Sequence, residues 1–251
     1  MAKGHTMSDA GVHAGSGDET LVVLDTAALT NLGVLARKAE AMDAHALLRI
    51  RAVAAGSPDD PVAASRPAGI ARVWATTPFG PVACRTMAIS PARDDMIVRA
   101  DAVSTATGDA RSVPQLDAAV PMTLGCGAAA DSSWPGRLPV DGGWTVLDAV
   151  PAGVFRDLET QARGVAKEES GPLGLPTSLL DQKVLTVRGT GTSDGADISM
   201  REVFALCAMG FIPVEPAADE HVRVSVKGRW RRLDGRFGSV YASEGFGVLP
   251  I

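Results

Sequence analysis

Residues 199–213, SMREVFALCAMGFIP, decide how the C-terminal half of the chain folds. Ser199 and Glu202 have the spacing of a capping box, in which a hydroxyl and a carboxylate each accept a hydrogen bond from the backbone at the helix N-terminus. At the other end, Gly210 can adopt the left-handed conformation that closes a helix, and Pro213 cannot continue one. The residues between these caps are apolar on every face. The sequence therefore predicts a helix that is enclosed by neighbouring elements and carries packing rather than a reacting group.

The composition bounds the class of protein. The 251 residues are 46% hydrophobic and 21% charged, which is typical of a globular protein, and the aromatic share of 4% leaves the core to Ala, Val and Leu. No apolar run approaches the roughly 20 residues that a membrane-spanning helix needs. Residues 1–19 lack the apolar stretch of a secretory signal, so we expect a disordered tail and a cytoplasmic protein that makes no membrane contact.

We expect an α+β fold of two lobes. Residues 20–140 predict an N-terminal β-α-β-β-β-α lobe, because short apolar or alternating runs are interrupted by two segments of helical periodicity. Residues 56–67 are expected to form a loop. The elements expected in this lobe are a strand at 21–25, a helix at 26–43, a strand at 48–52, a hairpin of strands at 70–76 and 82–89, a strand at 96–100 and a short helix at 101–107.

A connection rich in Gly, Ala, Ser and Pro follows over residues 108–143, and we place the boundary between the lobes near residue 140. Trp134 and Trp144 bracket its end, and each large ring is expected to anchor against a core. Residues 141–251 predict a C-terminal lobe of about three helices with a small antiparallel sheet. Its helices are expected at 151–170, 177–182 and 199–210, and its strands at 184–188, 222–227 and 239–242.

The clearest electrostatic feature is a basic segment near the C-terminus. Residues 221–240 contain six Lys or Arg residues and one acid, although the whole chain has a net charge of −5. We therefore expect a basic β-hairpin that contacts a macromolecular partner. Its candidate binding residues are Arg223, Lys227, Arg229, Trp230, Arg231, Arg232 and Arg236.

We expect a non-enzymatic binding or regulatory protein whose partner is another protein or a second copy of the chain, and the basic segment leaves two alternatives open. A basic hairpin behind a helix resembles the wing of a winged-helix module, which binds nucleic-acid phosphates. Against this, the helix that would read bases is wholly apolar, and the strand at 184–188 falls between the second and third helices. The other alternative is a solvated strand face that discourages edge pairing, or arginines paired with acids at Asp157, Glu159, Glu168 and Glu169.

An enzyme is a third hypothesis, which rests on Cys126 or on the glycine loop at Gly189–Gly195. Flanking glycines could expose Cys126 as a nucleophile, but such a thiol needs a base, and neither His45 nor His221 lies in a partner motif. The loop follows a strand and precedes a helix, yet its GxGxxxG spacing is not the dinucleotide fingerprint. The three cysteines and four histidines have no metal-binding spacing, and we expect no metal or cofactor.

Three stretches resemble an uncharacterised family of actinobacterial proteins of about 250 residues. They are TSLLDQKVLTV (177–187), ISMREVFALCAMGFIP (198–213) and GRWRRLDGRFGSVYAS (228–243). The resemblance spans both halves and is clearest over residues 176–243. It implies a cytoplasmic bacterial protein, and it carries over no catalytic residue, ligand or partner.

Overall fold

The computed structural model describes residues 17–53, 69–112, 121–169, 176–189 and 195–243. Most of the N-terminal elements predicted from periodicity are confirmed within a few residues, and the helix predicted at 101–107 is longer. The loop predicted at 56–67 lies outside the described residues. The elements of this half are β1 (Asp18–Val23), α1 (Thr26–Met42), β2 (Leu47–Ala52), β3 (Ala71–Ala75), β4 (Val82–Met87), β5 (Ile89–Pro91), β6 (Asp95–Arg99), α2 (Ala100–Arg111) and β7 (Met122–Ala128).

The C-terminal half contains the three predicted helices and more strands than expected. A 3₁₀ turn (Asp131–Ser133) precedes it. Its elements are β8 (Thr145–Pro151), α3 (Ala152–Glu169), α4 (Thr177–Leu180), β9 (Lys183–Arg188), β10 (Gly195–Ser199), α5 (Met200–Ala208), β11 (His221–Lys227), β12 (Trp230–Gly235) and β13 (Gly238–Ser243). Among the described residues, no helix is long and apolar enough to cross a membrane.

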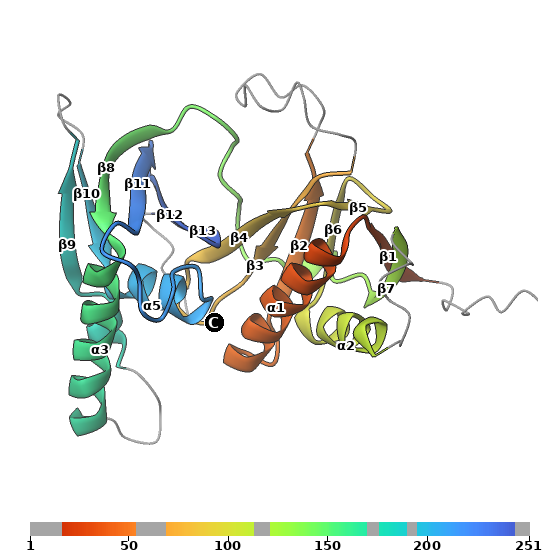
Figure 1. The fold of residues 1–251 in the computed structure, drawn as a ribbon, viewed down its shortest axis with the longest axis horizontal. Coiled ribbons are helices and arrows are strands. Elements are labelled where there is room, and N and C mark those ends of the chain that lie inside the picture. The colour runs from red at the N-terminus through yellow and green to blue at the C-terminus, as the bar shows by residue number, and fades with distance from the viewer. Residues whose placement is uncertain (1–16, 54–68, 113–120, 170–175, 190–194, 244–251) are drawn as a thin grey trace, which may run out of the picture.

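An antiparallel sheet of eight strands runs through both halves of the chain, in the order β6-β2-β3-β4-β13-β12-β11-β8 (Figure 1). The two halves meet where β13 pairs with β4, over the three pairs Ser239↔Cys84, Val240↔Ala83 and Tyr241↔Val82. Two smaller antiparallel sheets, β5-β1-β7 and β10-β9, complete an α+β fold. The halves therefore share one sheet, and the predicted division into lobes near residue 140 stays a prediction.

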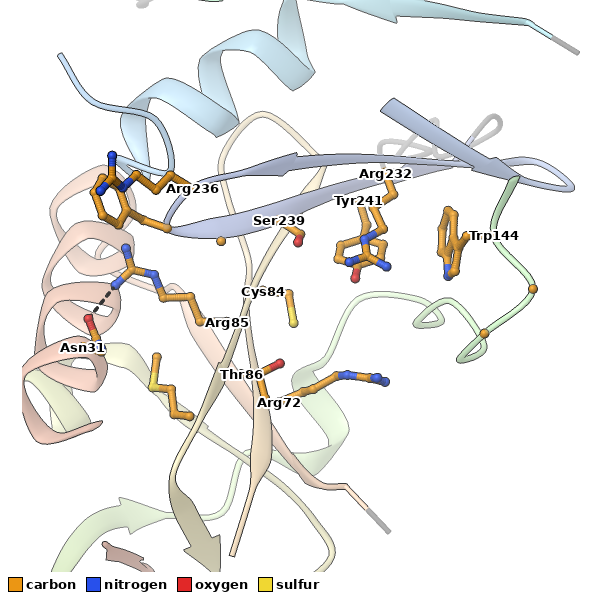
Figure 2. Close-up of a pocket in the computed structure, with 15 residues that line it drawn as sticks. Asn31, Arg72, Cys84, Arg85, Thr86, Trp144, Arg232, Arg236, Ser239 and Tyr241 are labelled. Carbon is orange, nitrogen blue, oxygen red and sulfur yellow. Dashed lines mark hydrogen bonds between the residues drawn. The ribbon is translucent and has the colours of Figure 1, made fainter. Parts of the chain in front are cut away.

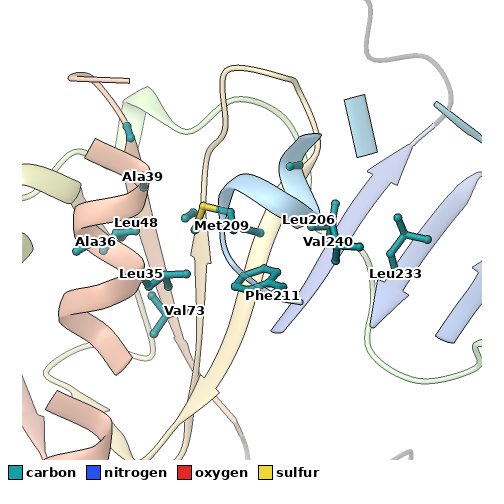
Figure 3. Close-up of a cluster of buried hydrophobic side chains, with 14 of the residues drawn as sticks. Leu35, Ala36, Ala39, Leu48, Val73, Leu206, Met209, Phe211, Leu233 and Val240 are labelled. Carbon is teal, nitrogen blue, oxygen red and sulfur yellow. The ribbon is translucent and has the colours of Figure 1, made fainter. Parts of the chain in front are cut away.

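Helices α1 and α5 pack against one face of the large sheet (Figure 3). Leu35 of α1 lies by Val73 of β3, and Leu206 of α5 lies by Val240 of β13. These four side chains are fully buried and belong to one hydrophobic cluster that includes residues of both halves. Each half also pairs its helices, α1 with α2 and α3 with α5.

The opposite face of the sheet carries a smaller aromatic cluster built on Trp74, Cys84 and Tyr241. The connection between the halves crosses this face, because Trp134 and Trp144 pack against the cluster. The predicted anchoring of both tryptophans is thereby confirmed. Side chains along a strand alternate between faces, and the central strands β3, β4, β12 and β13 contribute to both clusters.

Helix α5 has the two ends that the sequence predicts. The Ser199 backbone N–H and hydroxyl donate to Glu202 Oε2 at 2.9 and 2.8 Å. Gly210 adopts φ +66°, its N–H donates to the Cys207 carbonyl at 3.0 Å, and the next residue's N–H donates to the Leu206 carbonyl at 3.1 Å. This pair of bonds is a Schellman motif. The helix is enclosed, as predicted, with seven of its nine residues buried.

Several boundaries differ from those predicted. Residues 108–143 are not a plain connection, because α2 extends to Arg111 and β7 lies within them. A short strand, β10, separates the glycine segment from α5, so that segment does not lead directly into the helix. The expected two-stranded hairpin is a three-stranded meander, since β12 lies between β11 and β13. Residues 1–16 of the predicted tail lie outside the described residues, and β1 begins at Asp18.

Candidate functional site

A pocket of about 660 Å³ lies where β4 and β13 separate (Figure 2). The β4–β13 ladder ends at Cys84, whereas β4 continues to Met87 and β13 begins at Gly238. The turn between β12 and β13 closes one side of the pocket and packs on Phe211, whose carbonyl accepts from the Phe237 N–H at 3.0 Å. A Cβ on Gly238 would lie 2.6 Å from the Phe211 ring, so only glycine allows this close approach.

Four arginines line the pocket, and they come from both faces of the sheet. Arg85 lies opposite Val73 in the β3–β4 ladder and therefore shares the face covered by the helices. Arg72 lies opposite Thr86 on the other face, where Arg232 of β12 also lies opposite Tyr241. Arg236, in the β12–β13 turn, is drawn beside Arg85 in Figure 2. No acidic side chain is among the described residues that line the pocket.

Arg85 is the least compensated of the four. Its Nη1 donates to Asn31 Oδ1 of α1 at 3.3 Å, and its guanidinium lies 5.3 Å from the centre of the Phe211 ring. Its Nε is buried without a hydrogen-bond partner, and no carboxylate of the described residues pairs with it. Burial lowers the pKa of Arg85 from its usual value, because the charged form loses hydration. The side chain therefore holds a partly desolvated charge at the edge of the pocket.

The other three arginines each touch one acid at the margin of the pocket. Arg72 pairs with Asp141 in the connection between the halves. Arg232 Nε donates to Asp234 Oδ1 at 2.6 Å, and its guanidinium lies over the Trp144 and Tyr241 rings. Since a guanidinium has five N–H donors, these contacts leave donors of each arginine available to a further anion.

Arg236 Nη1 meets Glu220 Oε2 at 3.3 Å, and the Arg236 side chain is 61% exposed. An exposed pair of this kind neutralises little of the arginine's charge. Arg85 and Arg236 therefore give the helix-covered face of the pocket a positive charge, and Arg72 and Arg232, each paired with one acid, line the opposite face.

The structure distributes the predicted basic segment over several places. Arg231 turns away from the pocket and its Nε donates to Glu202 Oε1 at 2.8 Å, with the two side chains 14% and 1% exposed. Arg223 pairs with Asp234 at 3.1 Å. Lys227 Nζ donates to backbone carbonyls of the connection, including that of Asp141 at 3.1 Å. The segment is therefore not one continuous basic face.

A second, smaller pocket of about 290 Å³ is lined by Arg229 and Trp230, the two predicted residues not yet described. Arg229 is exposed at the turn between β11 and β12, and Trp230 lies beside it at the start of β12. Lys227 and Arg231 also line this pocket. Of the seven predicted binding residues, only Arg232 and Arg236 reach the larger pocket, and the binding role of the whole set stays a prediction.

Among the acids expected to pair with these arginines, Glu159 has other partners, and the side chains of Glu168 and Glu169 lie outside the described part of the chain. Glu159 pairs instead with Arg156 at 2.9 Å and Arg163 at 2.8 Å, three and four residues away on the same helix. Side chains three or four residues apart on a helix are neighbours, so these pairs form within α3. The partners of Arg231 and Arg232 are Glu202 and Asp234, which the sequence analysis does not assign.

Cys126, the nucleophile proposed for an enzyme, does not lie in a reactive setting. Cys126 lies in β7 with no exposed surface, and burial raises the pKa of its thiol to about 12. The described part of the chain holds no group of three or more His, Cys, Asp or Glu side chains that could bind a metal ion. Residues 190–194 of the glycine loop lie outside the described residues, so its predicted phosphate role stays untested.

Two family models match the chain, one in each half. Residues 16–130 match a domain of unknown function, DUF8010, and residues 139–247 match a second, DUF8185. Both matches fit an uncharacterised family, and the actinobacterial origin stays a prediction. The comparison with curated protein sequences finds no match.

Solved structures of sliding clamps are similar to this chain. A C. crescentus beta sliding clamp with polyethylene glycol bound has a TM-score of 0.46 and 10% identity, over 90% of this chain and 65% of that chain. A sliding clamp (DNA polymerase III subunit beta) from Bartonella birtlesii, bound to griselimycin, has a TM-score of 0.48 and 12% identity, over 93% of this chain and 66% of that chain. The chain thus spans just under two thirds of these clamps.

Arg72 and Arg85 are the two pocket arginines that the sequence analysis misses. Each stands alone among apolar neighbours on a strand, so neither forms a local basic cluster. The sequence signal at Arg85 is a single arginine in a short, mainly apolar strand, VACRTM of β4. Long charged side chains are rarely buried without a partner, and such a position is therefore a candidate for function.

Proposed function

We propose that this protein is a non-enzymatic binding protein that recognises acidic groups of a macromolecular partner through the arginine-lined pocket. The observation that carries the proposal is Arg85, a half-buried arginine whose Nε is buried without a hydrogen-bond partner and which has no carboxylate partner among the described residues, in a pocket lined by three further arginines. Arg232 and Arg236 join this pocket to the basic C-terminal strands. A regulatory role follows if the partner is itself regulated.

The physical basis is the cost of burying an unpaired charge. A buried cation that lacks a partner is destabilising, and an arriving carboxylate or phosphate would relieve that cost while forming charge-assisted hydrogen bonds. Arginine suits this task because its planar fork can bind either group through two parallel bonds. The rigid strands β3, β4, β12 and β13 hold the guanidiniums in place before the ligand arrives.

The proposal favours a protein partner over a winged-helix mode of nucleic-acid binding. Helix α5 would have to enter a groove in that mode, but its side chains are buried in the fold. We also propose the cytoplasm as the compartment. The three cysteines are buried and unpaired, which suits a reducing environment.

Binding of a fluorescent hexaglutamate peptide, followed by anisotropy at several salt concentrations, tests the proposal. Arg85→Ala is expected to weaken binding about tenfold, because it removes a charge-assisted contact worth roughly 1.5–3 kcal/mol. Arg188→Ala is the matched control, since it removes an equal charge from an exposed site on β9 and should change affinity less than about twofold. Thermal melts confirm that both variants are folded. Equal losses in the two variants, or no binding to the wild-type protein, would remove the proposal.

A further inference from the structure

Strand β4 has an edge that is only partly paired. On one side β3 pairs with it through Met87, while on the other side the ladder to β13 stops at Cys84. Residues 85–87 thus have a neighbouring strand on one side only, among the described residues. Backbone N–H and C=O groups of successive strand residues point to alternate edges, so this stretch presents peptide groups to the pocket.

The arginines are arranged as an added strand would require. Side chains of an extended peptide alternate between the two faces of the sheet that it joins. Arg85 and Arg236 lie on the helix-covered side of the pocket, and Arg72 and Arg232 lie on the other side (Figure 2). A peptide along the edge of β4 would therefore meet positive charge on both of its faces, and consecutive acidic residues would satisfy both.

The strand edge also discriminates between classes of anion. A nucleic-acid backbone offers acceptors but no N–H donors in a repeating extended array, so it could satisfy the arginines and leave the strand carbonyls unpaired. A peptide supplies both its donors and its acidic side chains. The volume of about 660 Å³ lies within the range of ordinary ligand pockets, and a segment of three residues extends about 10 Å along a strand.

We propose that the partner is a protein with a short acidic segment, which binds in extended conformation as an additional strand on the edge of β4 at residues 85–87. The inference rests on the proposed function and specifies its ligand. The segment contains consecutive Asp or Glu residues, one facing Arg85 and Arg236 and the next facing Arg72 and Arg232. Main-chain hydrogen bonds to β4 supply affinity, and the arginines select for acidic side chains.

The test compares two blocked hexaglutamate peptides of equal charge on the full-length protein. One is unmodified, and the other is N-methylated at every backbone nitrogen, which removes the donors that strand addition needs. The modified peptide is expected to bind at least about tenfold more weakly, because two or more main-chain hydrogen bonds are lost. Equal affinity for the two peptides, with binding still sensitive to Arg85→Ala, overturns strand addition and leaves the proposed function standing.

Two further measurements decide between the remaining occupants. Amide hydrogen exchange of the β4 segment is expected to slow on adding the unmodified peptide, while exchange of the β9 segment serves as the control. Random-sequence duplex DNA is expected to bind more weakly than the peptide at equal charge. If the duplex binds more tightly, or if the protein self-associates through this edge so that the peptide cannot compete, the proposed occupant is wrong. If neither probe binds, the proposed function fails with it.

Discussion

At the scale of single residues, we expect the charge of Arg85 to lower the stability of the fold and to strengthen ligand binding. Its guanidinium is partly desolvated, and it makes one long hydrogen bond to Asn31 and a contact with the Phe211 ring. Arg85→Met keeps the length of the side chain and removes the charge. We expect this variant to raise the free energy of unfolding by about 0.5–2 kcal/mol, measured by urea denaturation, while it loses peptide binding. A lower free energy of unfolding in the variant would mean that Arg85 stabilises the fold, and this would contradict a role for its charge in ligand binding alone.

The three cysteine thiols lead to a prediction about reactivity. Cys84, Cys126 and Cys207 are buried, and burial raises the pKa of each thiol to about 12. Because the shift is upward, the reactive thiolate is scarce at neutral pH, on the order of 10⁻⁴ of each site near pH 8. Iodoacetamide should therefore leave the folded protein unlabelled and should label three sites in guanidinium, as read from intact mass. Rapid labelling of Cys126 in the folded protein would restore the enzyme hypothesis.

At the scale of secondary-structure elements, α5 is fastened to the sheet through its own cap. Glu202 accepts hydrogen bonds from Ser199 of its cap and from Arg231 of β12, and it has no exposed surface. Glu202→Ala removes the cap and the carboxylate that Arg231 Nε contacts. We expect a loss of about 3–5 kcal/mol in the free energy of unfolding, measured by chemical denaturation.

Two variants separate the causes of that loss. Arg223→Ala removes an arginine whose side chain is 56% exposed, from an ion pair on the same sheet, and should cost at most about 1 kcal/mol. The double variant Glu202→Ala with Arg231→Met should recover part of the stability, because no unpaired buried charge remains. No recovery in the double variant would show that the loss comes from the helix cap alone.

The elements that the sequence predicts well are those with a strong local pattern. The caps of α5 and the amphipathic turns of α1 are read directly from residue spacing. Strands β5, β7, β8, β10 and β12 are missed, and the patterns of β7, β8 and β10 are weak. β7 contains two glycines, which weaken a strand signal, and β8 buries only one of its seven residues. β10 has five residues and begins with a glycine.

At the scale of the whole molecule, the pocket depends on a contact that no local pattern contains. Strand β13 reaches β4 after more than half of the chain has intervened, and only that pairing brings Arg232 and Arg236 beside Arg85. Hydrophobic periodicity predicts where helices and strands occur, but it does not say which strands pair with one another. The predicted basic segment contributes Arg232 and Arg236 to the pocket, whereas Arg72 on β3 and Arg85 on β4 come from the other half.

Because the two halves share one sheet, we expect them to unfold cooperatively. The helix-side cluster includes Leu48 of β2 and Leu206 of α5, one from each half and both fully buried. Leu48→Ala and Leu206→Ala should each cost about 2–5 kcal/mol and shift the same single transition, because neither half can keep its core without the other. Unfolding followed by far-UV circular dichroism and by tryptophan fluorescence measures this. Separate transitions, each moved by only one of the substitutions, would mean that the three residue pairs between β4 and β13 do not couple the halves.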